Sequence, residues 1–275
     1  MTIAIETHGL TRQFDDQTAV DHVDLQVDTG TFYGFLGPNG AGKSTTIKML
    51  TGLLAPTSGA IGILGLNPFD ADQAIEIKRR IGVVPEHLSL FDNLTAREYL
   101  TFVGRMYLLS KTVIQQRSDE LLALMQLEKE HKKLTLEYSH GMKKKLALAA
   151  AMLPNPDLLF LDEPFEGVDA VASKVIRDTL AEFVSRGSTV FLTSHVMEVV
   201  ERLCTHVGII SAGKLVQQTS LEILKRDNQS LENCFLEIVG KREGAIEKLS
   251  WLDHHESRPE ETNDAPKSES EGSQP

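Results

Sequence analysis

The sequence has few cysteines and no apolar run long enough to cross a bilayer. Its two cysteines, Cys204 and Cys234, lie far apart and form no CxxC pair, so neither a disulfide framework nor a zinc site is indicated. A reduced, cytosolic compartment is therefore favoured. The most apolar stretch, residues 146–161, is interrupted by polar and proline positions at residues 154–157. Because this stretch is shorter than a transmembrane helix, we expect a chain without a membrane span.

The sequence also lacks an excess of basic residues, and its first residues are not expected to form a secretory signal. Its 28 lysines and arginines stand against 39 aspartates and glutamates, which gives a formal net charge of −11. Binding to nucleic acid regardless of base sequence needs a basic surface that displaces phosphate counterions, so we expect no nucleic-acid partner. Residues 1–6 have neither the basic region nor the apolar core of a secretory signal. Any contact with a membrane is expected to come through a protein partner.

What the sequence does contain is 41% hydrophobic residues, enough for a packed core. Apolar and polar residues alternate within residues 1–35, and this period predicts an N-terminal antiparallel β region. Further along, short apolar runs are each followed by a helical stretch, which is typical of a parallel sheet covered on both faces. These runs and their helices are residues 32–36 and 43–50, 158–161 and 170–184, and 189–192 and 195–203. The predicted fold class is therefore α/β.

Two further regions are predicted beside this core. Residues 91–137 show no convincing strand pattern, and apolar positions recur there at helical spacing, so we expect a helical insertion. After residues 207–210 the sequence predicts a turn at Gly213, a strand through Val216 and a helix from Ser220. Residues 252–275 hold seven acidic and two basic residues with almost no large apolar side chain, which predicts a disordered acidic tail.

Residues 37–45 form a glycine-rich segment between an apolar strand and a helix. They match the phosphate-loop pattern GxxxxGK[ST] and read Gly37, Pro38, Asn39, Gly40, Ala41, Gly42, Lys43, Ser44 and Thr45. Glycines let backbone N–H groups converge on phosphates, and the helix N-terminus adds its dipole. We expect Lys43 to reach the β- and γ-phosphates and the Ser44 hydroxyl to bind Mg²⁺. A chance match to the four fixed positions is expected in roughly 1% of chains of this length, so a nucleotide site is favoured.

A second element supports the phosphate loop. The apolar run at residues 158–161 ends in Asp162 and Glu163, and the carboxyl ends of buried parallel strands are where such sheets bind ligands. Asp162 can bind Mg²⁺, directly or through water. Glu163 points elsewhere and can act as the general base that polarises the attacking water. Taken alone, an apolar run followed by Asp-Glu is common, but the functional interpretation is favoured beside the phosphate loop.

Together these segments resemble the nucleotide-binding subunit of an ABC transporter. The resemblance covers about residues 1–240 and rests on the phosphate loop, residues 139–143, the Asp162-Glu163 strand and the run Thr193-Ser194-His195. It implies a P-loop NTPase parallel-sheet core with a helical subdomain at about residues 91–153, followed by a C-terminal extension at residues 241–275. It also implies that the ligands are ATP and Mg²⁺.

The resemblance assigns roles to single residues. Phe14 falls where the family stacks an aromatic ring on adenine, Asp169 fits the D-loop, and His195 fits the histidine that contacts the γ-phosphate. Where many members have glutamine, this chain has Glu86, a carboxylate that can bind Mg²⁺ or position water. The family's LSGGQ signature corresponds here to Tyr138, Ser139, His140, Gly141 and Met142, followed by Lys143.

The signature implies a partner. In the family this segment faces the ATP of a second ATPase subunit, in a head-to-tail homodimer or heterodimer that ATP holds together. Ser139 and Gly141 open the predicted helix 140–152, whose N-terminus attracts anions. Simpler interpretations stay open, since Ser139 is also a reasonable helix N-cap and residues 143–145, three lysines, are usually a solvated face.

Other candidates have simple alternatives as well. A lone aromatic such as Phe14 is more often part of a core, and His195 can be a polar residue at a helix N-terminus. Cys204 is expected to be a buried core thiol. His254 and His255 lie in the polar tail, and we assign them no metal.

The sequence therefore predicts an ATP-hydrolysing subunit that drives export through a separate integral membrane permease. The variant signature, Glu86 and residues 230–236 resemble the ATPase subunits of bacterial multidrug, antibiotic or ion exporters. Such a subunit is expected to be cytoplasmic and peripheral at the inner face of the cell membrane. The permease is expected to dock on residues 86–108, where the candidate contacts are Leu88, Leu90, Phe91 and Tyr99.

Two other functions were weighed. A soluble ABC ATPase in translation or DNA repair is disfavoured because the chain has one cassette, no sustained heptads and an acidic charge balance. A P-loop kinase or GTPase is disfavoured because a kinase has no use for the Ser139 segment and no NKxD-like guanine-binding sequence is present.

Overall fold

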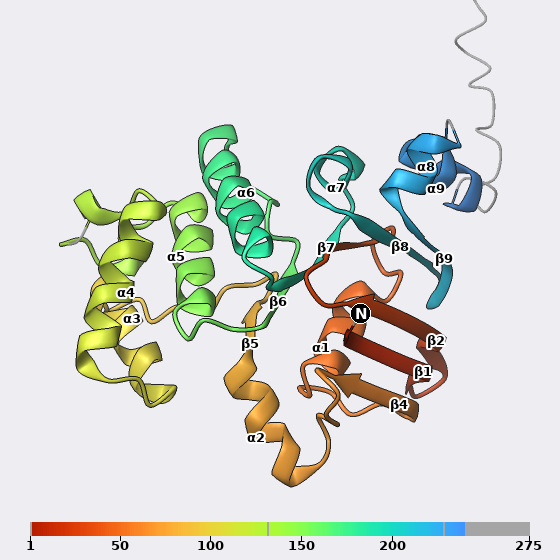
Figure 1. The fold of residues 1–275 in the computed structure, drawn as a ribbon, viewed down its shortest axis with the longest axis horizontal. Helices are drawn as coiled ribbons and strands as arrows, with labels where there is room; N and C mark the ends of the chain where they lie inside the picture. The colour runs from red at the N-terminus through yellow and green to blue at the C-terminus, as the bar shows by residue number, and fades with distance from the viewer. Residues whose placement is uncertain (1, 131, 228, 240–275) are drawn as a thin grey trace, which may run out of the picture. The chain divides into compact units, whose positions relative to one another are not determined.

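A three-stranded antiparallel sheet contains the N-terminus. The computed structural model describes residues 2–130, 132–227 and 229–239, and Figure 1 shows this sheet in red and orange. Its strand order is β2-β1-β4, with β1 at Ile3–Phe14, β2 at Gln17–Asp28 and β4 at Ser58–Ile63. The predicted antiparallel β region is confirmed. The sequence analysis did not assign β4.

A second sheet of six strands forms the centre of the fold. Its order is β5-β6-β7-β3-β8-β9, and the first five strands are parallel. Their bounds are β3 Phe32–Leu36, β5 Ile81–Val84, β6 Leu158–Asp162, β7 Thr189–Ser194, β8 His206–Ser211 and β9 Lys214–Ser220. The strand predicted to end at Val216 therefore continues to Ser220. It runs antiparallel to β8 because a two-residue turn cannot make the crossover that a parallel pair needs.

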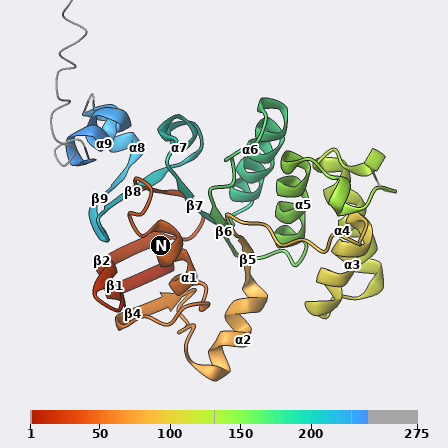
Figure 2. The ribbon, with the colours of Figure 1, turned by 180° about the vertical axis from the view of Figure 1, so that it is seen from behind.

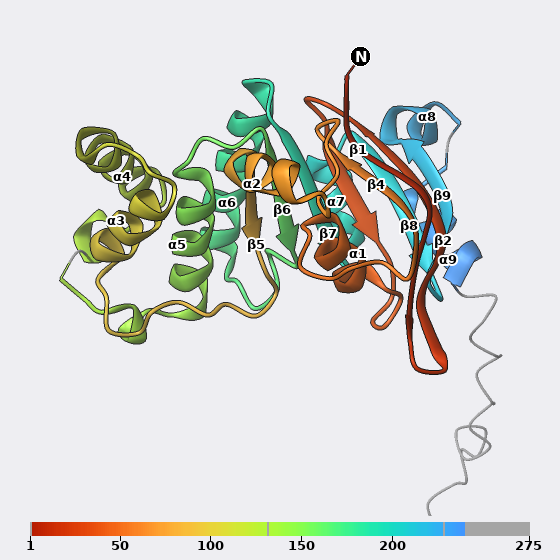
Figure 3. The same ribbon diagram turned by 90° about the horizontal axis from the view of Figure 1, so that it is seen from below.

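Successive residues of the central strands enter opposite cores. Phe32 and Leu36 of β3 belong to one apolar cluster, and Tyr33 and Phe35 belong to the other. The first cluster is completed mainly by α5 (His140–Met152) and α6 (Ala170–Ser185), and the second by α1 (Lys43–Leu50) and the N-terminal sheet. Figure 3 shows α1 lying between the two sheets. The prediction that the parallel sheet is covered on both faces is confirmed.

The predicted insertion is helical. It contains α3 (Ala96–Met106), α4 (Lys111–Leu124) and two short 3-10 turns, Glu128–Glu130 and Thr135–Glu137. Helix α3 begins at a capping box in which the Thr95 hydroxyl accepts a hydrogen bond from the Glu98 N–H and the Glu98 carboxylate accepts one from the Thr95 N–H. Figure 2 shows α3 and α4 beside α5, at the side of the fold away from β9.

The remaining helices are short. They are α2 Ala71–Arg80, α7 Met197–Leu203, α8 Leu221–Arg226 and α9 Leu231–Val239. The helix predicted from His195 begins two residues later, so His195 lies in the connection that follows β7. Within the described ranges, no helix combines the length and apolar character that a bilayer span requires. The predicted acidic tail and the pair His254-His255 lie outside the described residues.

Candidate nucleotide site

The predicted phosphate loop connects β3 to α1. A side chain on Gly37 would place its Cβ 2.5 Å from the Ile210 carbonyl oxygen. Gly42 has a φ of 107°, and its Cβ would lie 2.5 Å from the Ala19 carbonyl oxygen. Both positions therefore require glycine. Gly42 is also the N-cap of α1 and offers no side-chain hydrogen bond, so the first N–H groups of the helix remain available to an anion.

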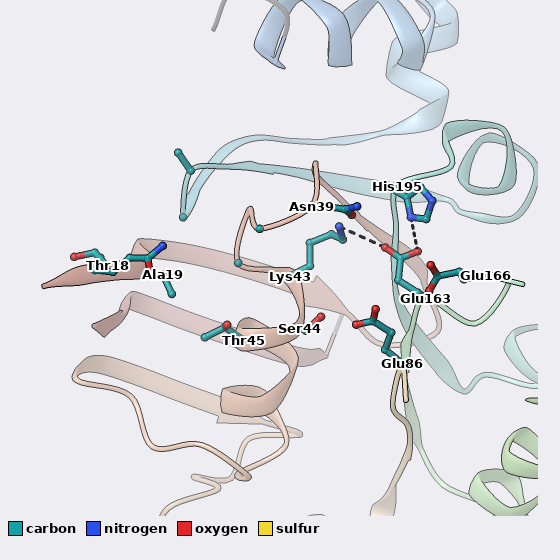
Figure 4. Close-up of a pocket in the computed structure, with 15 residues that line it drawn as sticks. Thr18, Ala19, Asn39, Lys43, Ser44, Thr45, Glu86, Glu163, Glu166 and His195 are labelled. Atoms are coloured by element: carbon teal, nitrogen blue, oxygen red, sulfur yellow. Dashed lines mark hydrogen bonds and ion pairs between the residues drawn. The ribbon is translucent and has the colours of Figure 1, made fainter. Parts of the chain in front are cut away.

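Lys43 lies at the start of α1 with its ammonium group folded over the loop. Its Nζ donates hydrogen bonds to the carbonyl oxygens of Gly37, at 2.8 Å, and Pro38, at 3.3 Å. The same Nζ lies 3.4 Å from Oε1 of Glu163. Figure 4 shows these two side chains pointing toward one another. A buried cation thus stands where the sequence predicts contact with phosphates.

Glu163 follows β6 and is held from several sides. Its backbone has a φ of 47°, a region that costs free energy for residues other than glycine and that is often found at functional sites. Its N–H donates to the Thr193 hydroxyl at 3.0 Å, and that hydroxyl donates to Oδ1 of Asp162 at 2.6 Å. On the other side, Nδ1 of His195 lies 3.1 Å from Oε2 of Glu163. The predicted general base and the predicted γ-phosphate histidine are therefore in direct contact.

These groups line one cavity of about 540 Å³. In Figure 4, Thr18 and Ala19 of β2 lie on one side of the loop, and Glu86, Glu163 and Glu166 lie on the other. The cavity is lined by Gln17, Thr18, Ala19, Asn39, Gly40, Gly42, Lys43, Ser44, Thr45, Glu86, Glu163, Glu166, His195, Ala212 and Gly213. The structure thus brings together most of the predicted loop, Glu86, Glu163 and His195.

Several residues that line the cavity were not predicted from the sequence. Gln17 to Ala19 and the pair Ala212-Gly213 carry no chemical signal, and only their position in the fold brings them to the cavity. Glu166 had a signal, because it is a third acid close behind the Asp162-Glu163 pair. Its side chain is exposed in the cavity wall, and the structure gives it no ion pair with another described residue.

The oxygen donors predicted to bind Mg²⁺ lie around the loop. Ser44 and Glu86 line the cavity and face one another in Figure 4. Asp162 is only 4% exposed and is not a lining residue, and one of its two carboxylate oxygens accepts the Thr193 hydrogen bond. Hydroxyl and carboxylate oxygens are the ligands that Mg²⁺ prefers, so the donor set fits this ion.

Phe14 lies beside the cavity and is not among the residues that line it. It ends β1 opposite Gln17, which does line the cavity, and its ring is 43% exposed. The Arg12 guanidinium lies 4.5 Å from the ring centroid. The alternative that Phe14 is a core residue is therefore wrong, and its contact with adenine stays a prediction.

The predicted signature forms a separate cluster. Ser139 caps α5 by accepting a hydrogen bond from the Met142 N–H at 3.3 Å. Asp169 caps α6, and its carboxylate accepts a hydrogen bond from the Ala172 N–H. This hydrogen bond is the main reason why the pKa of the Asp169 carboxyl group is lowered. A Cβ on Gly141 would lie 3.3 Å from the Asp169 carboxylate, so the starts of the two helices are in contact. None of Ser139, His140, Gly141, Met142 and Asp169 lines the cavity that Lys43 lines.

The interpretation of the three lysines at residues 143–145 as a solvated face is wrong for Lys144 and Lys145. Lys144 is 2% exposed and Lys145 is 7% exposed, while Lys143 is partly exposed. Burial lowers the pKa of both Lys144 and Lys145. The prediction for Cys204 is confirmed, since it is a buried free thiol whose pKa is raised by burial.

Known proteins match both the sequence and the fold. Residues 20–166 match the family described as ABC transporter. The chain is 42% identical to the bacitracin transport ATP-binding protein BcrA of Bacillus licheniformis over 83% of this chain and 74% of that protein. It is 38% identical to a Nod factor export ATP-binding protein I of Cupriavidus metallidurans over 79% of this chain and 71% of that protein.

Two solved structures have the same fold. A structure of an ATP-binding subunit of an ABC transporter has a TM-score of 0.79 and 31% identity, covering 86% of this chain and 99% of that chain. A dimeric structure of a bacterial ABC transporter cassette has a TM-score of 0.73 and 25% identity, covering 79% of this chain and 98% of that chain. The α/β fold with its phosphate loop is thus shared with ATP-binding cassettes.

Proposed function

The chain belongs to the ABC transporter family, as an ATP-binding and ATP-hydrolysing subunit, and we propose that its ATP hydrolysis drives export through a separate membrane permease. The relative named for Nod factor export supports this direction of transport, and the relative named for bacitracin transport supports the role in transport. We place the ATPase domain at residues 1–240, with a helical subdomain at about residues 91–153 and an extension at residues 241–275.

The observation that carries the proposal is the contact of Lys43, Glu163 and His195 above the phosphate loop. In ATP hydrolysis a water attacks the γ-phosphate, and its proton must move to a base. Glu163 accepts that proton, while the Lys43 ammonium and the N–H groups of the loop stabilise the phosphate oxygens. His195 holds the carboxylate and contacts the γ-phosphate. Phe14 stacks on the adenine.

Ser44, Asp162 and Glu86 are the residues that hold Mg²⁺ in this proposal. When bound, the ion neutralises phosphate charge and orients the phosphate oxygens. Glu86 replaces the usual glutamine, so an anionic oxygen stands where the family offers an amide. Bound phosphates also give Lys43 stronger acceptors than the two loop carbonyls that it contacts in the free chain.

The site is half of a composite site. Residues 139–142 and Asp169 lie together at the starts of α5 and α6, and none of them lines the Lys43 cavity. We propose that they cover the ATP of a second ATPase subunit, which is either another copy of this chain or a related chain. The dimeric cassette with the same fold supports this arrangement.

The permease contact is proposed at a groove between the sheet and the helical insertion. A cavity of about 460 Å³ has a mainly apolar lining that includes Val83, Leu88, Leu90 and Tyr99. The predicted docking residues Leu88, Leu90 and Tyr99 are only partly buried there, and Phe91 nearby is 51% exposed. The ring of Phe91 packs edge-on against those of Tyr99 and Phe102, at centroid distances of 6.1 and 5.0 Å. A permease segment that binds here would bury this apolar surface. By this contact the permease would hold the chain at the inner face of the cell membrane.

The alternative function in translation or DNA repair is not supported, because the relatives reported above are transport proteins. The proposal is tested by co-expressing the chain with a candidate membrane permease and measuring two quantities: co-purification and transport that depends on ATP. Phe91→Ala should weaken co-purification, while Phe69→Ala, at a 40% exposed phenylalanine elsewhere, should not. Equal recovery with wild type and both variants, or transport without ATP hydrolysis, would contradict the proposal.

A further inference from the structure

Lys144 is a buried cation outside the site described so far. It lies in the second turn of α5 and is 2% exposed. Its Nζ donates hydrogen bonds to the main-chain carbonyl oxygens of Glu163, at 3.0 Å, and Glu86, at 3.3 Å. Glu86 and Glu163 are two of the three acidic residues that line the nucleotide cavity beyond the phosphate loop, and the third is Glu166. Lys144 therefore contacts Glu86 and Glu163 through the main chain without lining the cavity itself.

The carbonyl groups of Glu86 and Glu163 occupy equivalent positions just beyond two neighbouring strands of the sheet. Strands β5 and β6 are neighbours, and their pairing ends with Val84 opposite Leu161. Glu86 and Glu163 each stand two residues beyond this last pair. No strand pairing holds the backbone at that point, and the Lys144 ammonium bridges the two chain segments instead. Without Lys144, the part-buried carbonyl oxygen of Glu86 and the buried one of Glu163 would lose a charged hydrogen-bond donor.

Burying a lysine here is costly, which indicates that the interaction is specific. Burial lowers the pKa of Lys144, and the carboxylates of Glu166, Asp162, Glu86 and Glu163 act in the opposite direction by favouring the charged form. A well-packed apolar side chain at the same position would avoid the cost of removing a charge from water. The position instead holds a cation with carboxylates around it and two carbonyl oxygens as hydrogen-bond acceptors.

The neighbouring lysines make different contacts. Lys145 is also buried, but its charged neighbours are Asp169 and Glu128. Lys143 is partly exposed, and its Nζ lies 4.0 Å from Oδ1 of Asp92. Only Lys144 of the three donates to the residues of the nucleotide site in the described structure.

We propose that Lys144 is a positioning residue for ATP hydrolysis, which holds the main chain of Glu86 and Glu163 so that their carboxylates face the phosphate loop. The inference rests on the proposed role of Glu163 in hydrolysis. Glu163 adopts a left-handed backbone conformation that is costly unless its surroundings hold it, and the Lys144 hydrogen bond is one such restraint. Lys144 affects the reaction through the position of Glu163 and not by contact with ATP.

The test compares three variants of the full chain with wild type. Lys144→Met keeps the apolar stem and removes every donor, and Lys144→Arg keeps the charge and the donors. The control is Lys111→Met, at an exposed lysine of α4 that lies outside the nucleotide cavity and the signature. For each variant we would measure the ATP dissociation constant, the single-turnover rate of hydrolysis with Mg²⁺ and the melting temperature. Lys144→Met should lower the rate about 10- to 100-fold because a misplaced base loses its reacting geometry. Its dissociation constant should stay within about threefold of wild type.

The other variants separate positioning from folding. Lys144→Arg should recover most of the rate, and Lys111→Met should match wild type. If Lys144→Met does not fold, Lys144→Gln is measured instead; it keeps an uncharged NH₂ group on a shorter side chain and should give a reduced rate with unchanged affinity. A wild-type rate in the folded Met or Gln variant, or a fall in ATP affinity as large as the fall in rate, would overturn the inference. Absence of turnover in wild type and Lys111→Met would instead contradict the proposed hydrolytic function.

Discussion

Nδ1 of His195 lies 3.1 Å from Oε2 of Glu163, and this contact joins two strands of the central sheet at their carboxyl ends. The other carboxylate oxygen of Glu163 faces Lys43 at 3.4 Å. The Glu163 side chain is thus held between a cation of the phosphate loop and the His195 imidazole, and the Glu163 side chain itself is only 8% exposed. A proton acceptor held in one orientation loses little entropy when water and phosphate arrive.

His195→Ala should slow hydrolysis more than it weakens ATP binding. The substitution frees one oxygen of Glu163 and removes the proposed contact with the γ-phosphate, so we expect the rate constant kcat to fall about 10-fold or more. His8→Ala is the control, because His8 is an exposed histidine of β1 far from the loop in the sequence. Steady-state kinetics with Mg²⁺ and ATP measure both variants. Equal kcat values for His195→Ala and wild type would remove His195 from the site.

Lys43→Ala should weaken ATP binding. The substitution removes a charge-assisted contact with phosphate, and hydrogen bonds to charged groups are worth about 1.5–3 kcal/mol, so the dissociation constant should rise about 10- to 100-fold. Lys48→Ala is the matched control, since Lys48 is an exposed lysine in the last turn of the same helix. Equilibrium titration with ATP gives both values. Full affinity in Lys43→Ala would contradict the placement of the phosphates.

Ser139→Ala separates the role of a helix cap from the role of a signature residue. Ser110 caps α4 with the same geometry, since each serine hydroxyl accepts a hydrogen bond at 3.3 Å from the N–H three residues later. Removing either cap should cost about 1 kcal/mol of unfolding free energy. Only Ser139→Ala should raise the chain concentration needed for half-maximal ATP hydrolysis, because only Ser139 covers the ATP of a second subunit. The same concentration dependence in both variants would leave Ser139 as a cap alone.

Cys204 should react slowly with thiol reagents in the folded chain. Burial raises the pKa of Cys204, and burial is also the main reason why the pKa of Cys234 is raised. Because the thiolate is the reactive form, a raised pKa leaves less of it at pH 7 to 9 than an ordinary cysteine would have. Both thiols should become reactive on unfolding, and Cys204→Ala should remove the slower phase. Rapid modification of two thiols in the native chain would contradict the burial of Cys204.

The sequence was sufficient to predict that the main residues of the nucleotide site lie close together in space. Lys43, Glu163 and His195 each follow a buried apolar run, and the carboxyl ends of parallel strands meet at one edge of a sheet. The helices from Lys43 and from His140 were predicted to within a residue, because the phosphate-loop pattern marks the first start and the Ser139 cap marks the second. The helix after β7 was predicted two residues too early, since His195 belongs to the strand's connection.

Other features depend on contacts between distant segments. Strand β4 contains two glycines and an alanine, which disfavour strands, and it forms because β1 offers an edge to pair with. A run of three lysines in a helix suggests a solvated face, but the carbonyl oxygens that receive Lys144 are 58 and 19 residues away in the sequence. Local patterning therefore could not predict that this lysine is buried.

Replacing Glu163 with Gln tests the central claim most directly. The amide keeps the size of the side chain and cannot accept the proton, so single-turnover hydrolysis should slow about 100-fold or more while the ATP dissociation constant stays within about threefold. Glu166→Gln is the comparison, because Glu166 lines the same cavity and has no ion pair with a described residue. The account predicts loss of turnover in Glu163→Gln and not in Glu166→Gln. Unchanged turnover in Glu163→Gln would contradict it.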